Sequence, residues 1–223
     1  MNQRKPARRA VLGSFLLAPL LSITGTSPAA AEVNTAPPGV VPALQQWTGG
    51  TGSLTLTSSS RIVVPPGAPA ALRALATQVA AEAAELTSLR LTAATGTPRA
   101  GDISLRIDAS ADFGSAKTEL RPEAYRLTVT RGSVEIVGGG RKGAYYGTRT
   151  LLQSLLGSAN RDSIPVGTAV DYPNYAVRGF MLDVGRRYFT PEFIKSYLHW
   201  MGWLKLNTFQ LHLQRQRDPS SGR

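Results

Sequence analysis

Apolar and polar residues alternate in several short stretches of the chain, a pattern typical of strands with one buried face. Two short alternating pieces, LTL and RIVV, fall within 54–64 and are separated by a serine-rich turn. The stretch 102–108 alternates strictly, and so does 125–130. Gly132 separates the last of these from a returning apolar segment at 134–136, which predicts a hairpin.

Two other segments carry apolar residues at helical spacing. The segment 69–89 is rich in Ala and Leu, with one apolar stripe, and a second helix is expected over 142–156. Strands on one side and helices on the other predict an α+β domain over 54–160, with a small antiparallel sheet and two helices on one of its faces. The preceding residues, 32–53, are rich in Pro, Gly and Thr and are expected to form a linker.

The pattern changes after a connector at 160–174 that contains Pro and Asp. Residues 177–184 form a near-continuous apolar run, typical of a strand covered on both faces. Thr190 is suited to cap a helix, with Pro191 at its first position, and an apolar strand follows at 208–213. This order predicts one βαβ unit with parallel strands.

Three consecutive glycines, Gly138 to Gly140, precede the second predicted helix. A glycine-rich turn before a helix is compatible with phosphate binding at the helix N-terminus. A phosphate loop, however, needs Lys followed by Ser or Thr, and here Gly143 follows Lys142. We therefore expect the glycines to serve a sharp strand-to-helix turn.

The first 31 residues have the composition of a secretory signal. Arg4, Lys5, Arg8 and Arg9 precede an apolar run, 10–24, that is short for a membrane span, and Ala29 to Ala31 suit signal peptidase. A membrane anchor is the alternative. From this order we expect a secreted protein that keeps no stable membrane anchor after cleavage. Because Arg8-Arg9 loosely resembles a twin-arginine motif, export could use either the Sec or the twin-arginine route.

Charge and composition restrict the function further. Removing residues 1–31 lowers the formal charge from +11 to +7, because four of the 25 basic residues and none of the 14 acidic ones are lost. The remaining arginines are scattered, whereas a nucleic-acid interface would concentrate them, so no nucleic-acid partner is expected. The chain has no cysteine and two isolated histidines, and we expect no metal site and no cofactor.

The βαβ segment resembles the opening of the catalytic barrel of glycoside hydrolase family 20, the β-N-acetylhexosaminidases. The matching residues are Arg178-Gly179, Met181 to Asp183, Arg186, Lys205 to Asn207 and His212-Leu213. Residues 123–155 are similar to the end of the α+β domain that precedes this barrel. The resemblance implies an incomplete (β/α)8 barrel over 176–213, consisting of its first strand, helix and second strand.

The family resemblance also implies an activity and roles for individual residues. It implies retaining hydrolysis of terminal N-acetylglucosamine or N-acetylgalactosamine in glycans, with the 2-acetamido group of the sugar as nucleophile. Arg186 corresponds to the sugar-binding arginine, and Asp183, Arg178 and His212 are expected to support the framework. The catalytic Asp-Glu pair belongs to a later strand, so no catalytic residue is assigned in this chain.

The last ten residues depart from the family pattern. The family continues after His-Leu with one residue and two acids, but here Gln214 is followed by Arg215 and Gln216. We expect 214–223 to be an unstructured tail, out of frame, and the chain to be an inactive, truncated part of the enzyme. Two alternatives stay open: a secreted module that binds glycan or protein without catalysis, and a peripheral anion binder attracted by charge.

Overall fold

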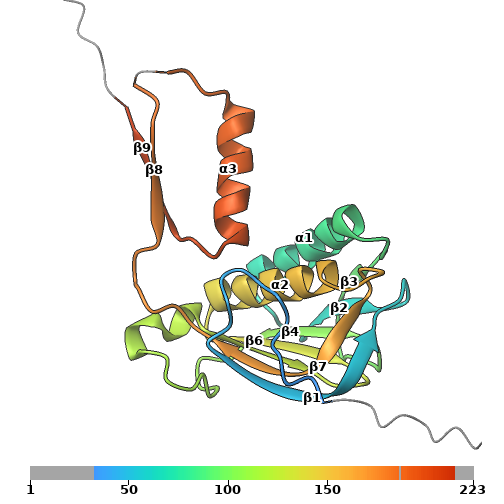
Figure 1. Ribbon diagram of the computed structural model, residues 1–223. Coiled ribbons are helices and arrows are strands. Elements are labelled where there is room, and N and C mark those ends of the chain that lie inside the picture. Colours follow the sequence, from blue (N-terminus) through green and yellow to red (C-terminus); the bar gives the residue numbers. More distant parts are fainter. Residues whose placement is uncertain (1–32, 186, 214–223) are drawn as a thin grey trace, which may run out of the picture. The chain divides into compact units, whose positions relative to one another are not determined.

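The computed structural model describes residues 33–185 and 187–213. Most of this part of the chain forms a seven-stranded sheet with two helices (Figure 1). From one edge to the other the strands are β1 (Gln46–Thr55), β7 (Ser163–Asp171), β5 (Tyr125–Val129), β6 (Val134–Gly138), β4 (Ile103–Ile107), β2 (Arg61–Val64) and β3 (Thr92–Thr95).

The sheet is mixed rather than wholly antiparallel. Strands β1, β7, β5 and β6 pair antiparallel, and the predicted β5–β6 hairpin is present. Strands β6, β4, β2 and β3 pair parallel. Parallel neighbours need a crossover connection, and helix α1 (Ala70–Leu86) supplies it between β2 and β3. The prediction of a small antiparallel sheet was therefore wrong for three of the six strand pairings.

Two helices cover one face of the sheet, which confirms the predicted α+β class. Helix α1 and helix α2 (Arg141–Leu156) both contribute to one hydrophobic core with the sheet residues beneath them (Figure 1). Fully buried members come from the strands and from both helices, among them Ile62, Val79, Leu105, Ile136 and Leu151. Every side chain buried in this core belongs to residues 54–169.

The other face carries a smaller apolar cluster around Phe113. Residues between β4 and β5 fold back over it through a short 3-10 helix, η1 (Thr118–Glu123). Phe113 is completely buried beside Val137 of β6. This segment brings Glu123 to the start of β5, next to the helical face.

Two predicted boundaries were wrong because strands were missed there. The expected linker, 32–53, contains most of β1, and the expected connector, 160–174, contains β7, so the sheet extends from 46 to 171 rather than from 54 to 160. β1 contains three glycines and several Thr residues and is an edge strand, while β7 contains Pro165 and Gly167. These residue types are typical of loops, and pairing between the two strands outweighs their weak local preference.

The predicted βαβ unit is present at 179–212. Strand β8 (Gly179–Asp183) pairs parallel with β9 (Thr208–His212), and helix α3 (Pro191–Trp203) connects them. The Thr190 hydroxyl accepts a hydrogen bond from the backbone N–H of Phe193, as the predicted N-cap requires. The expectation that the first strand is covered on both faces fails in the described residues, because Phe180 and Met181 are 42% and 51% exposed.

The described residues contain neither a membrane-spanning helix nor a cluster of metal-binding side chains. No helix in 33–185 or 187–213 combines the length and apolarity needed to cross a bilayer. The same residues contain no group of three or more His, Cys, Asp or Glu side chains arranged to hold a metal ion.

Candidate functional site

Strands β8 and β9 place two of the predicted site residues side by side at their carboxyl ends. Asp183 and His212 are register partners, and Asp183 Oδ1 lies 3.4 Å from His212 Nδ1. The same carboxylate oxygen accepts a hydrogen bond of 2.9 Å from the backbone N–H of Gly185. Asp183 thus fixes the first residue after Val184 and lies beside the imidazole of its neighbour. Arg186, the predicted sugar-binding residue, lies outside the described residues.

Arg178 lies at the opposite, amino end of β8, where it contacts the α+β domain. Its guanidinium pairs with the carboxylate of Glu123 and donates to the carbonyls of Tyr175 and Lys205. The ring of Tyr146 lies 5.7 Å from the guanidinium carbon. The donors of Arg178 therefore act within the protein framework, far along the strand from Asp183.

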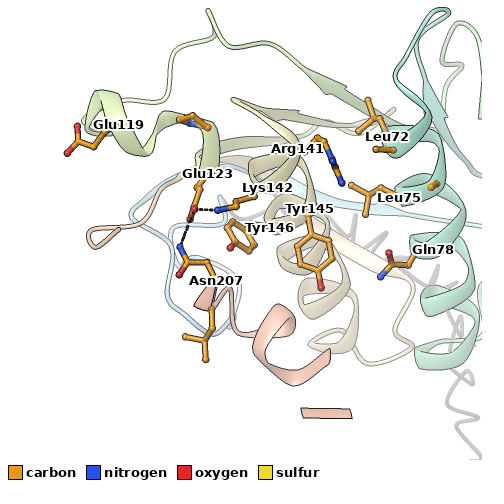
Figure 2. Close-up of a pocket in the computed structure, with 14 residues that line it drawn as sticks. Leu72, Leu75, Gln78, Glu119, Glu123, Arg141, Lys142, Tyr145, Tyr146 and Asn207 are labelled. Atoms are coloured by element: carbon orange, nitrogen blue, oxygen red, sulfur yellow. Dashed lines mark hydrogen bonds and ion pairs between the residues drawn. The ribbon is translucent and has the colours of Figure 1, made fainter. Parts of the chain in front are cut away.

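Glu123 accepts hydrogen bonds from three side chains in different elements. Lys142 of α2 donates at 2.8 Å and Asn207 at 3.2 Å, both to Oε1 (Figure 2), while Arg178 binds Oε2. Burial alone would raise the pKa of Glu123, but the hydrogen bonds from Lys142, Arg178 and Asn207 outweigh it and hold the pKa below its usual range. A carboxyl kept ionised in this way is unsuited to be a general acid near neutral pH.

A second polar cluster surrounds Lys205, which is 6% exposed. Its ammonium donates to Asp171 of β7 and to the hydroxyl of Tyr125 on β5, each at 2.9 Å. The Tyr125 hydroxyl also bonds to Asp171 and to Thr150 of α2. Burial lowers the pKa of Lys205, while Asp171 opposes this shift, and burial raises the pKa of Tyr125 well above its usual value.

The end of α3 completes the contact with α2. Gln153 donates to the carbonyl of Trp203 at 3.1 Å. The guanidinium of Arg149, which pairs with Glu82 of α1, lies 4.5 Å from the ring of Tyr145 and 5.8 Å from that of Trp203. Polar and cation–aromatic contacts thus join the βαβ unit to α2.

A groove of about 970 Å³ lies beside this junction, between α1 and α2 (Figure 2). Leu72 and Leu75 of α1 form part of one wall, and Tyr145 of α2 faces them. The charged residues along it come from η1 and the start of α2, and Leu206 and Asn207 line it from the βαβ unit. Since one face of Tyr145 lies against Arg149, that face is not free to stack on a sugar.

Glycines at the turn into α2 are closely packed against the backbone that precedes β5. A Cβ on Gly139 would lie 2.1 Å from the carbonyl oxygen of Arg121, and one on Gly143 would lie 2.0 Å from that of Ala124. These carbonyls crowd the turn into α2. They would repel an anion placed there.

Sequence reasoning gave Arg178 a framework role but did not identify its partner or the other residues that join the two parts of the chain. Asp171 lay in a predicted connector, and Glu123 follows a proline in a segment without periodicity. Lys205 was recognised only as part of a motif. A lysine between Leu204 and Leu206, at the end of an apolar helix, was the one available signal of burial.

The chain was compared with protein-family models and known proteins. Residues 37–172, more than half of the chain, match the model described as "Glycosyl hydrolase family 20, domain 2". Residues 175–217 match "Glycosyl hydrolase family 20, catalytic domain". The boundary between the two matches falls just after β7.

Relatives of the chain include enzymes from several bacteria. A lacto-N-biosidase of Bifidobacterium bifidum is 34% identical over 83% of this chain and 16% of its own length. A β-hexosaminidase of Akkermansia muciniphila is 38% identical over 42% of this chain and 19% of its own length. The solved structure of a GH20 β-N-acetylhexosaminidase from Streptomyces coelicolor A3(2) has a TM-score of 0.63 and 27% identity, covering 82% of this chain and 36% of that one.

A β-hexosaminidase of Streptomyces plicatus, solved in complex with its product GlcNAc, has a TM-score of 0.61 and 27% identity over 78% of this chain and 34% of that one. The chain thus spans less than a fifth of the length of the two curated relatives and about a third of the solved chains. The family-model matches confirm the resemblance seen in the sequence: this chain belongs to glycoside hydrolase family 20.

Proposed function

We propose that the protein to which this chain belongs hydrolyses terminal N-acetylhexosamine residues of glycans, with the 2-acetamido group of the sugar as nucleophile. The observation that carries this proposal is the match of 175–217 to the family's catalytic domain, together with a parallel β8–α3–β9 unit in the expected order. Active sites of such barrels lie at the carboxyl ends of the strands. Asp183 and His212 stand at that end.

In this proposal Arg186 binds sugar hydroxyls through its guanidinium fork. Asp183 positions the loop that carries it, since it already holds the backbone of Gly185. The acid that protonates the leaving oxygen comes from a later barrel strand. The described residues include two barrel strands, β8 and β9, where a closed barrel needs eight, so the 223-residue chain by itself is expected to be inactive.

A chimera tests this proposal. Residues 33–213 replace the matching segment of the Streptomyces coelicolor enzyme, and release of p-nitrophenol from the N-acetyl-β-glucosaminide is measured. We expect the chimera to be active and Arg186→Ala to lower its kcat/KM by about tenfold to a hundredfold, the loss typical of hydrogen bonds from a charged group. Arg187→Ala, the neighbouring arginine, is the matched control and should change little.

Two outcomes would contradict the proposal. One is a chimera that folds, as judged by circular dichroism, but does not cleave the substrate. The other is an equal effect of Arg186→Ala and Arg187→Ala. Hydrolysis by the purified 223-residue chain alone would refute the expectation that this portion is inactive.

We also propose that residues 1–31 direct export. Mass spectrometry of the protein recovered outside the cell should then give an amino terminus at Glu32. Replacing Arg8 and Arg9 with lysines should block export if the twin-arginine route is used and leave it intact if the Sec route is used. A cell-associated protein with an intact amino terminus would argue against a cleaved signal.

A further inference from the structure

The βαβ unit has almost no core of its own in the described residues. Among residues 175–185 and 187–213, Met201 and Lys205 are the buried ones, and Lys205 is buried against Asp171 and Tyr125 of the sheet. Large apolar side chains of β8, α3 and β9 stay substantially exposed, among them Met181, Trp200 and Leu211. A unit this small that buries so little apolar surface cannot offset the entropy of ordering its chain.

The α+β domain, in contrast, has a complete core. All buried members of its main apolar cluster lie within 54–169, and the βαβ unit adds only Trp203, which is partly buried, at the margin. Its polar groups facing the junction come from separate elements, with Glu123 in η1, Tyr125 in β5, Gln153 in α2 and Asp171 in β7. These groups are held in place by the sheet and helices of the domain itself.

Lys205 adds a second, independent observation. After α3 the backbone N–H of Leu206 bonds to the carbonyl of Met201, and that of Lys205 bonds to the carbonyl of Gly202. This is the double hydrogen-bond pattern of a helix end that normally has glycine in the left-handed position. Here that position holds Lys205, with φ of 59°. The backbone preference of this position for glycine is overridden. The hydrogen bonds of the lysine side chain that accompany this strain are made to Tyr125 and Asp171, both in the α+β domain.

We propose that the α+β domain is the folding template of the βαβ unit: its residues Glu123, Asp171, Tyr125 and Gln153 bind Arg178, Trp203, Lys205 and Asn207, and the unit orders only when so bound. The template acts at the amino ends of β8 and β9, the end opposite to Asp183 and His212. It therefore sets where the first barrel strands begin and how they are oriented. This role does not depend on hydrolase activity.

The variant Lys205→Gly, made in the full chain, distinguishes folding on the template from independent folding of the βαβ unit. Glycine relieves the left-handed backbone at the end of α3, so a self-folding unit would keep or increase its order. Under the template proposal the loss of the ammonium weakens docking, and the unit loses order although its helix end has improved. Amide hydrogen exchange, read by mass spectrometry, reports the two regions separately.

We expect Lys205→Gly to speed exchange of the β8 and β9 amides by about a hundredfold or more, the smaller end of the effect of removing one partner of a buried ion pair. Amides of β4, β5 and β6 should keep their protection. Glu123→Ala, which alters only the domain side, should speed exchange of the same β8 and β9 amides. Glu119→Ala, on an exposed position of the same 3-10 helix, is its matched control and should not.

Three results would overturn the proposal. The first is unchanged or slower exchange of β8 and β9 in Lys205→Gly, which would show that the unit folds by itself. The second is an equal loss of amide protection in β4, β5 and β6, which would show that the α+β domain and the βαβ unit unfold as one cooperative unit. The third is absence of protection in β8 and β9 of the wild-type chain.

Discussion

Gly143→Ala is the change that best tests why the turn into α2 is rich in glycine. Gly143 lies in the first turn of α2, and an added Cβ would lie 2.0 Å from the carbonyl oxygen of Ala124. Real Cβ atoms essentially never approach another atom within 3.0 Å, so α2 and the residues before β5 must separate by about 1 Å. The contact atom is backbone and cannot rotate away.

Two opposing effects decide the magnitude. Alanine favours the helix over glycine by about 1 kcal/mol. Overpacking at a buried site costs about 1–3 kcal/mol, and a clash with backbone lies at or beyond the upper end of that range. A net loss of about 2 kcal/mol of unfolding free energy follows. With a urea slope of about 1–3 kcal/mol/M, the midpoint should fall by about 1 M.

Urea unfolding followed by far-ultraviolet circular dichroism measures this loss. Gly157→Ala is the control at the other end of the same helix, where an added Cβ would meet its nearest atom at an ordinary 3.5 Å. That variant should be neutral or slightly stabilising, by up to about 1 kcal/mol. If Gly143→Ala is as stable as Gly157→Ala, close packing is not the reason for glycine at this position.

Two further changes probe the charged groups. Asp102 accepts hydrogen bonds from the Arg61 side chain and from the backbone of Arg61 and Arg99, and its side chain is 3% exposed. Asp102→Ala should therefore lower the free energy of unfolding, measured in urea, by about 3 kcal/mol. A loss below about 1 kcal/mol would contradict this interpretation. The pKa of Glu123 is depressed in the folded chain, so its contribution to stability is present above its ordinary pKa and is lost as pH falls through the folded value. The difference in stability between wild type and Glu123→Gln should therefore shrink below about pH 4.5, and a constant difference from pH 3 to 7 would argue against it.

Elements with a clear period of apolar residues were predictable from the sequence. The hairpin of β5 and β6, helices α1 and α2, and the capped helix α3 all combine such a period with turn or cap residues at the expected positions. Strand β3 (TAAT) and strands β1 and β7, with Gly, Thr and Pro165, have no comparable period. They form because neighbouring strands satisfy their backbone groups. For β1 and β7 that pairing joins residues more than a hundred positions apart in the sequence.

The site was less predictable, for a related reason. Asp183 and His212 come together because parallel strands meet at the same edge, which a βαβ pattern implies. The partners of Arg178 and Lys205 come from η1, β5 and β7, and no sequence spacing connects these elements to the barrel strands.

The motif through which the family is recognised includes residues with two kinds of role. Arg178, Lys205 and Asn207 contact the α+β domain at the amino ends of the strands, whereas substrate chemistry in a barrel belongs to the carboxyl ends. Substituting any of these three in an assembled enzyme should therefore lower stability and leave KM for the sugar largely unchanged, and a rise in KM without loss of stability would place them in the substrate site instead.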